Sequence, residues 1–410
     1  MPYCEVSTLG TKIFYRTYGH GSTKVLLING LAGTHKGWGP QIKGLAGTTE
    51  PNDEEGSPAA AVRRPDGCDE KGQPAGGIEV CCFDNRGVGW SSIPTNKSEY
   101  STTIMAKDAL ALLDHLGWRK AHVFGHSMGS MIACKLAAIA PQRLLSLALL
   151  NATGGGFECF PRIDSQMMSL AFRFLRAKTP EQRAAVDLET HYTKEYLDES
   201  VGTSTRRKIL HQEYVKAISS TGMQSSCGFE GQINACWTHK MTSKELDQIR
   251  TSGFLISVIH GRYDIIAQLY HARRLAEKLQ PASRMVELHG GHLVSHERPD
   301  EVNQSLMDLI KASNAGIKPQ DWSNLNDATS GWLVPGKPRT ISRVYSRTNY
   351  LVTVYNLLSK LQLSFLYLVG IFVMFFEYVR NIIRKPARVT DWNNEVNQPI
   401  YTSYNSNCNF

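Results

Sequence analysis

Short apolar runs alternate with longer segments of helical periodicity along most of this chain. Each run has four to seven residues, the length of a buried strand in a parallel sheet. The runs are Val25–Ile28, Val80–Phe83, Ala121–Phe124, Leu145–Leu150, Phe254–His260 and Met285–Leu288. Helical periodicity covers Trp38–Leu45, Thr102–Leu116, Met128–Ala140 and Gln268–Leu279. This alternation predicts an α/β fold with a mostly parallel central sheet and helices on both faces.

Two insertions interrupt the alternation. In a parallel sheet, connections that leave a strand start at its carboxyl edge, and connections that leave a helix return on the opposite side. Residues 47–77 follow a helix and are rich in Gly, Pro, Ala and charge, which predicts a flexible loop on that opposite side. Residues 157–245 follow the sixth strand, so we expect a helical lid above the carboxyl edge, with helices at 165–177, 180–187 and 206–218.

These boundaries divide the chain into five parts. They are a core (1–156 and 246–312), a helical lid (157–245), a linker (313–360), an apolar helix (361–379) and a polar tail (380–410). In the lid, four apolar side chains either line an acyl pocket or anchor the helices to the core. They are Met167, Met168, Phe172 and Phe174.

The apolar segment 361–379 has nineteen residues, of which only Gln362 and Glu377 are strongly polar. A helix of that length is about 28 Å long, close to the thickness of a bilayer core. Basic residues flank both ends, so we predict a transmembrane helix, with a soluble helix packed on the core or on a second copy as the alternative. The first residues lack a secretory signal pattern. We therefore expect a C-terminal membrane anchor with the main domain facing the cytosol, and a soluble cytoplasmic protein as the alternative.

Composition narrows the classes of function. The chain carries a net charge of +8, but residues 313–410 hold ten Lys and Arg against five Asp and Glu, so the basic bias belongs mostly to the tail. Nine cysteines, with Cys81 and Cys82 adjacent in one strand, do not suggest a disulfide framework and favour a reducing compartment. Gly-rich phosphate loops, HExxH and paired CxxC motifs are missing from the sequence. We expect no nucleic-acid partner, metal or cofactor.

One serine lies between glycines at the junction of a strand and a helix. Ser127 is the centre of Gly125-His126-Ser127-Met128-Gly129, after the strand 121–124 and before the helix 128–140. Such a sharp turn strains the serine backbone, and a Cβ at either flanking position would collide with a neighbouring strand or helix. Ser127 is therefore a candidate nucleophile, although a chain with 34 glycines also produces such pentapeptides by chance.

A serine hydroxyl needs a base, and the base needs a group that orients it. Asp264 follows the strand 254–260, and His292 follows the strand 285–288 after two glycines. We take His292 as the base and Asp264 as its acid, with His289 and His296 as alternative bases. Asp264 is also well placed to cap the following helix. The chain order Ser127, Asp264, His292 is typical of one hydrolase architecture.

Together these segments resemble the α/β-hydrolase superfamily, in its serine-esterase branch, over roughly residues 10–312. Val25–Ile28 followed by Asn29-Gly30-Leu31-Ala32-Gly33 resembles the family's oxyanion loop, and Asp84–Ser91 resembles its DxRGxGxS segment. The resemblance implies the α/β-hydrolase fold, with the backbone N–H groups of Met128 and Leu31 as the oxyanion hole. Most relatives carry histidine where this chain has Asn29.

Three acidic positions are interpreted as structural. The segment 84–91 is expected to brace the sheet without taking part in catalysis. Asp108 and Asp114 lie on the helical segment 102–116 and are expected to be solvated or to act as caps.

These features predict a serine hydrolase that cleaves a small-molecule ester, thioester or related acyl substrate through an acyl-enzyme. The apolar tail adds the expectation of a membrane-associated lipid esterase. Two alternatives stay open: a ligand-binding receptor or scaffold on the same fold with slow or no turnover, and an acyltransferase in which an alcohol captures the acyl group. The substrate and the oligomeric state do not follow from the sequence.

Overall fold

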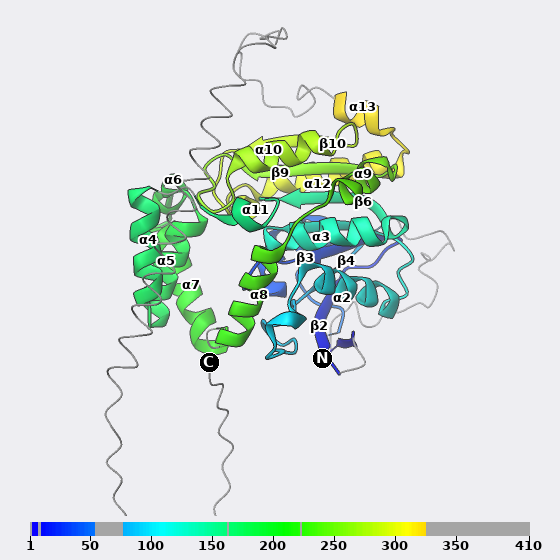
Figure 1. Cartoon of the computed structure of the whole chain (residues 1–410). Coiled ribbons are helices and arrows are strands. Elements are labelled where there is room, and N and C mark those ends of the chain that lie inside the picture. Colours follow the sequence, from blue (N-terminus) through cyan, green and yellow to red (C-terminus); the bar gives the residue numbers. More distant parts are fainter. Residues whose placement is uncertain (1, 7–9, 54–76, 162–163, 222–223, 325–410) are drawn as a thin grey trace, which may run out of the picture. The chain divides into compact units, whose positions relative to one another are not determined.

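A computed structural model describes residues 2–6, 10–53, 77–161, 164–221 and 224–324 (Figure 1). Its centre is an eight-stranded sheet with the order β1-β2-β4-β3-β5-β6-β9-β10. β2 is antiparallel to both of its neighbours, and the remaining pairs are parallel. The strands are β1 (Tyr3–Glu5), β2 (Lys12–Tyr18), β3 (Thr23–Ile28), β4 (Ile78–Phe83), β5 (Ala121–His126), β6 (Leu144–Leu150), β9 (Leu255–Gly261) and β10 (Ser283–Leu288), with a separate hairpin of β7 (Ser200–Val201) and β8 (Ser204–Thr205).

The helices of the core are α1 (Gly39–Ala46), α2 (Thr102–His115), α3 (Met128–Ile139), α10 (Leu269–Lys278), α11 (Val294–Glu297), α12 (Pro299–Asn314) and α13 (Pro319–Asn324). Those between β6 and β9 are α4 (Ser165–Arg176), α5 (Pro180–His191), α6 (Lys194–Asp198), α7 (Arg206–Thr221), α8 (Ser226–Thr238) and α9 (Ser243–Thr251). Short 3-10 turns are η1 (His35–Trp38), η3 (Lys97–Glu99), η4 (Pro141–Arg143) and η5 (Gly156–Cys159).

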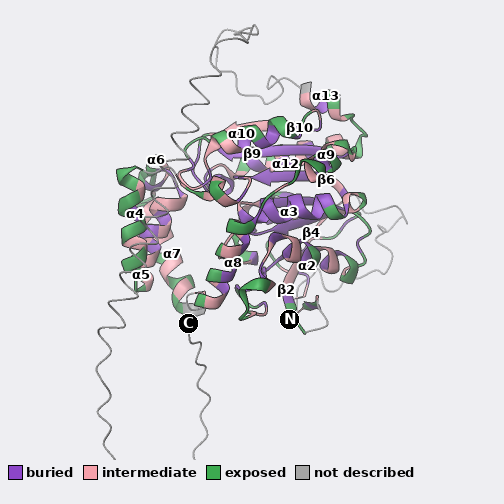
Figure 2. Ribbon diagram, in the orientation of Figure 1, coloured by how far each residue is buried: buried purple, intermediate pink, exposed green. Residues whose placement is uncertain are grey.

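Two apolar layers cover the sheet, one on each face. Residues of α2, α3, α9 and α10 join one layer, and residues of α1, α12 and α13 join the other. Successive strand residues alternate between the layers, so the adjacent Cys81 and Cys82 lie in opposite ones. Figure 2 shows the strands and α3 as the most continuously buried elements. The predicted fold class, a mostly parallel sheet between two layers of helices, is confirmed.

The segment between β6 and β9 is helical, as expected for the insertion. The helices expected at 165–177, 180–187 and 206–218 are present as α4, α5 and α7. Helices α4 to α7 contact one another at the left of Figure 1, whereas α8 contacts η3 and η5. The sequence did not predict α8, because its stretch is rich in Gly, Ser and Cys. Whether these helices act as a lid stays a prediction.

The segment after β4 braces the sheet through a buried ion pair. Arg86 donates from Nε and Nη2 to the two carboxylate oxygens of Asp108, at 2.6 and 2.7 Å, and from Nη1 to the carbonyl of Glu99. Asp108 is 3% exposed, so the expectation that it would be solvated or act as a cap is wrong. Burial raises the pKa of Asp108, and the guanidinium of Arg86 opposes that rise. The bidentate pair with Arg86 thus stabilises the buried carboxylate of Asp108.

The predicted end of the core at residue 312 falls too early. α12 continues to Asn314, and Trp322 of α13 is buried and donates from Nε1 to the carbonyl of Ile256 in β9, at 2.8 Å. Residues 54–76 of the predicted flexible loop and the predicted membrane helix 361–379 lie outside the described residues. Within the described part of the chain, no helix has the length and apolar character that crossing a bilayer requires.

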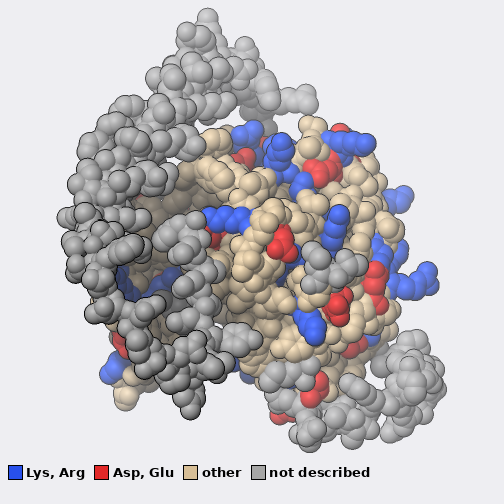
Figure 3. Space-filling model, turned by 60° about the horizontal axis from the view of Figure 1, so that its bottom comes forward, with Lys and Arg blue, Asp and Glu red and all other residues tan. Residues whose placement is uncertain are grey.

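Charged side chains of both signs share the surface shown in Figure 3. Several exposed residues of opposite charge form ion pairs among the described residues, as Lys97 does with Glu230 at 2.7 Å. Cys4, Cys81, Cys82 and Cys134 are buried thiols that form no disulfide.

Candidate active site

Ser127 occupies a strained turn between β5 and α3. Its φ of 54° and ψ of −119° lie in a region that residues with a side chain rarely adopt. A Cβ on Gly125 would stand 2.2 Å from the carbonyl oxygen of Gly129, and a Cβ on Gly129 would stand 2.1 Å from that of Ile28 in β3. Both flanking glycines are therefore required by close packing against helix and strand, as the sequence predicted.

Asp264 lies in the loop after β9, and each of its two carboxylate oxygens accepts two hydrogen bonds. Its Oδ1 accepts hydrogen bonds from the backbone N–H groups of Ile266 and Ala267, both at 2.8 Å. Its Oδ2 accepts from His292 Nδ1 at 2.8 Å and from Asn151 Nδ2 at 2.7 Å. Burial alone would raise the pKa of Asp264, but the charge and the hydrogen bond of His292, followed by His260 and the Asn151 hydrogen bond, together outweigh it and lower the pKa to about 2. Asp264 is thus a carboxylate at neutral pH.

His292 lies between two other histidines. Its ring centroid is 4.9 Å from that of His126 and 6.0 Å from that of His191 in α5. His126 Nε2 donates to the backbone carbonyl of His292 at 2.8 Å, which joins the histidine loop directly to the neighbour of Ser127. Burial, followed by the charge of His292, lowers the pKa of both flanking histidines to about 3, so both are neutral at neutral pH.

The structure thus pairs Asp264 with His292 at the carboxyl edge of the sheet, and it joins the backbone carbonyl of His292 to His126, the residue before Ser127. Ser127 N–H donates to the carbonyl of Leu150 at the end of β6, and the next residue, Asn151, bonds Asp264. Among the described residues Ser127 Oγ has no hydrogen-bond partner, so only the Asp264–His292 half of the relay is a formed hydrogen bond. Bonds to a nucleophile are often long before substrate binds. The role of each side chain stays a proposal.

The two amides predicted to form the oxyanion hole have free donors. Met128 is the first residue of α3, where an N–H group has no acceptor within its own helix. Neither Met128 N–H nor Leu31 N–H donates a hydrogen bond to any described residue. Asn29 fixes the start of the Leu31 loop, because its Nδ2 donates to the carbonyl of Phe83 and its carbonyl accepts from Asn85 Nδ2, both at 2.9 Å.

The other histidines of this loop have different partners. Arg298 donates to the carbonyl of His289 at 2.9 Å, and the His289 ring packs edge-on against Tyr263. His296 Nε2 donates to the carbonyl of Gly37 at 2.7 Å. Neither of them hydrogen-bonds to Asp264, whose imidazole partner is His292.

Two positioning residues escaped the sequence analysis. Asn151, which directly follows β6, has a φ of 48° and donates from Nδ2 to Asp264 and to the Gly291 carbonyl. Glu297 is 3% exposed and accepts at Oε1 from the N–H groups of Gly291 and Thr193, at 2.8 and 2.9 Å. It thereby ties the loop of His292 to the helical insertion. Neither residue belongs to a motif, so only the folded chain reveals them.

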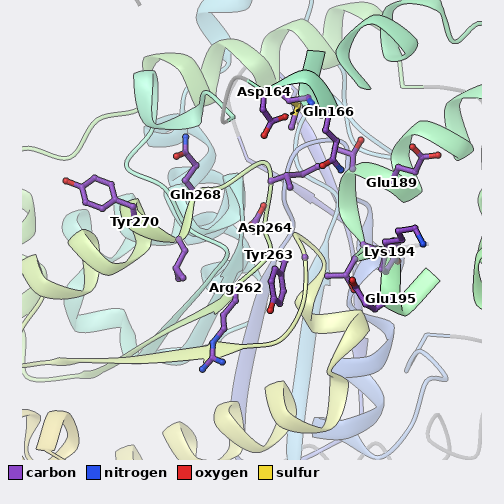
Figure 4. Close-up of a pocket in the computed structure, with 17 residues that line it drawn as sticks. Asp164, Gln166, Glu189, Lys194, Glu195, Arg262, Tyr263, Asp264, Gln268 and Tyr270 are labelled. Carbon is purple, nitrogen blue, oxygen red and sulfur yellow. Dashed lines mark hydrogen bonds between the residues drawn. The ribbon is translucent and has the colours of Figure 1, made fainter. Parts of the chain in front are cut away.

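A cavity of about 520 Å³ borders this site on the Asp264 side (Figure 4). The insertion contributes Asp164, Glu189 and Lys194 to its wall, and the loop after β9 contributes Arg262 and Tyr263.

Most residues that line this cavity are polar or charged, unlike those of the acyl pocket considered for the insertion. Of the four apolar residues proposed for that pocket only Met167 lines the cavity, whereas Met168 and Phe172 are 62% and 54% exposed and Phe174 stacks on Phe229. Within the described ranges no cluster of His, Cys, Asp or Glu is arranged to hold a metal ion.

Comparisons with known proteins agree with this fold. Residues 24–299 match the family described as "alpha/beta hydrolase fold". The chain is 26% identical over 246 residues to "Putative non-heme bromoperoxidase BpoC" of Mycobacterium tuberculosis, covering 59% of this chain and 86% of that protein. It is 26% identical over 314 residues to "Putative carbamate hydrolase RutD" of Azorhizobium caulinodans, covering 75% and 97%. In structure it resembles the enol-lactonase of Burkholderia xenovorans, with a TM-score of 0.56, 22% identity, and coverage of 76% and 100%.

Proposed function

Because the chain belongs to the α/β-hydrolase family, we propose that it is a serine hydrolase that cleaves an ester, thioester or related acyl compound through an acyl-enzyme. One observation carries the proposal: an imidazole hydrogen-bonded to a buried carboxylate adjoins the strained turn that presents a serine. That combination is what a serine needs to act as a nucleophile at neutral pH.

The roles follow from the chemistry of acyl transfer. Ser127 Oγ attacks the carbonyl carbon while His292 Nε2 takes its proton, and Asp264 holds Nδ1–H and stabilises the imidazolium. The N–H groups of Met128 and Leu31 hydrogen-bond to the oxyanion of the tetrahedral intermediate. His292 then donates the proton to the leaving group, and a water molecule activated by His292 releases the acid. This scheme requires no cofactor.

We further place this hydrolase at a membrane, with lipid esters as its substrates. The apolar sequence 361–379 supports this proposal, as does α4, which exposes Met168, Phe172 and Leu175 at 62%, 54% and 80%. These residues repeat at helical spacing, so they form one apolar stripe of the kind that rests on a lipid surface. Protease treatment of intact membranes tests the orientation: a protected catalytic domain would contradict a cytosol-facing enzyme.

The nucleophile is tested by labelling the full chain with a fluorophosphonate, which reacts with activated serines. The unaltered chain should be labelled and Ser127→Ala should not, because the mutant lacks the attacking oxygen. Ser130→Ala is a matched control, since Ser130 Oγ lies three residues away and donates to the carbonyls of Gly125 and Leu150. Labelling that persists in Ser127→Ala would refute the nucleophile, and an unlabelled native chain would favour a binding protein. A panel of lipid esters, small esters, thioesters and carbamates then sorts the substrate class.

A further inference from the structure

Gln232 of α8 is a polar side chain with no exposure to solvent, and it hydrogen-bonds to the loops that follow β3 and β4. Its Oε1 accepts a hydrogen bond from the backbone N–H of Ala32 at 2.9 Å. Its Nε2 donates to the carbonyl of Arg86, also at 2.9 Å. Gln224 Nε2 donates to the same Oε1 at 3.1 Å and to the Gly87 carbonyl at 2.7 Å. One buried amide therefore joins the insertion to two loops at the carboxyl edge of the sheet.

The helix that carries Gln232 is held close to the core by its own sequence. A Cβ on Gly228 would stand 2.0 Å from the carbonyl oxygen of Gly87, and a Cβ on Gly231 would stand 2.5 Å from the ring of Tyr100. Asn234 Nδ2 donates to the Tyr100 carbonyl at 3.2 Å. Because both glycines allow a close approach, of Gly228 to the Gly87 backbone and of Gly231 to the Tyr100 ring, α8 lies at a depth at which the Gln232 side chain reaches Ala32.

The loop that Gln232 reaches is a tight turn closed by one internal hydrogen bond, from Gly33 N–H to the Gly30 carbonyl at 3.2 Å. Ala32 has a φ of 60°, a conformation that costs free energy for a residue with a Cβ. The hydrogen bond from Ala32 N–H to Gln232 offsets part of this free-energy cost. In the same conformation, the N–H of the preceding Leu31 has no acceptor among the described residues. The conformation that frees the Leu31 donor is thus the one that Gln232 stabilises.

We infer that Gln232 is a positioning residue that holds the Leu31 amide in place to bind the oxyanion. This inference rests on the proposed function and deepens it: α8 belongs to the fixed frame of the catalytic site, although it lies in the inserted segment. Gln232 touches no reacting atom and acts only through Ala32. A donor held for the transition state affects the chemical step more than ground-state binding.

The test compares two substitutions on the same helix in the full chain, with p-nitrophenyl butyrate as the substrate. Gln232→Met keeps the length of the side chain and removes its hydrogen bonds. It should lower kcat by about 10- to 100-fold while KM changes by less than about threefold, since a misplaced oxyanion donor costs transition-state binding. Asn234→Ala, which loosens α8 from Tyr100 and not from Ala32, should change kcat by less than about threefold.

The possible outcomes separate the explanations. An unchanged kcat in Gln232→Met, or an equal loss in Asn234→Ala, would overturn the inference. If Gln232→Met does not fold, Gln232→Asn, which keeps a polar amide but is too short to reach Ala32, must give the same loss of kcat. If Ser127 of the unaltered chain fails to react with a fluorophosphonate, the proposed function and this inference fall together. If it reacts and Gln232→Met keeps full kcat, only this inference falls.

Discussion

The protein contains two pairs of aspartate and histidine that look alike in isolation, one on each side of Ser127. Asp264 follows β9 and accepts from His292 Nδ1 at 2.8 Å, and Asp84 follows β4 and accepts from His35 Nδ1 at 2.9 Å. Each strand lies two places from β5 in the sheet, on opposite sides. Burial does not separate the pairs either, because the side chains are 6% and 0% exposed in the first and 8% and 1% in the second.

The difference lies in what stands beyond each imidazole. The ring of His35 packs against Phe14 and Trp90, with centroids at 5.0 and 5.6 Å. The ring of His292 packs against His126, the neighbour of Ser127. An Asp–His hydrogen bond by itself is therefore no evidence of catalysis. We propose that Asp264 and His292 act in catalysis and that Asp84 and His35 hold the loop after β4 in place.

Replacing each histidine should give the largest difference between the two pairs in kcat and in stability. His292→Ala should lower kcat by about 10³-fold or more, because it removes the proposed base. His35→Ala should keep kcat within about threefold for the folded protein and lower the free energy of unfolding by about 1–3 kcal/mol, since Asp84 loses a buried partner. Ester hydrolysis and thermal unfolding measure the two effects. His289→Ala serves as a control and should be mild; if it is the crippled variant, the base is misplaced.

The stability of the protein at acid pH should show a second difference between the pairs. His292 packs against two neutral histidines, whereas His35 packs against Phe14 and Trp90. The pKa of His191 is lowered to about 3, so the unfolded chain binds a proton there below about 6.5 while the folded chain does not. The free energy of unfolding should therefore fall as the pH drops from about 6.5 towards 3. His191→Phe removes this term and should flatten the fall by about 1–3 kcal/mol at pH 4, as urea titrations would show. An unchanged slope would contradict the burial of a neutral imidazole.

The smallest expected effect concerns the two carboxylates. Asp264 accepts a hydrogen bond from the side-chain amide of Asn151, whereas no side-chain amide among the described residues donates to Asp84. Asn151→Gly keeps the positive φ available and removes the amide. It should lower kcat by about tenfold, since one hydrogen bond to a buried charge contributes about 1.5–3 kcal/mol, part of which relaxation recovers. A kcat within twofold of wild type would show that His292 and the backbone amides suffice to hold Asp264.

Much of the fold and of the site could be predicted because its signals are local. The strands read as apolar runs, and Gly125 and Gly129 mark the turn at Ser127 whatever surrounds it. The weaker predictions concern elements without periodicity. α8 was missed because its sequence is rich in Gly and Ser, yet Gly228 and Gly231 are there to let the helix approach Gly87 and Tyr100. The solvated position expected for Asp108 was wrong, because its partner Arg86 lies 22 residues away.

The sequence by itself determined the α/β architecture and the strained serine turn, since both depend on short-range steric limits and on the burial of apolar runs. Only the tertiary structure decided which histidine meets which aspartate, and that Gln232 reaches Ala32 across 200 residues. Such contacts depend on where strands and helices place side chains in space. When the partner of a polar residue lies far away in the sequence, the residues next to it do not identify that partner.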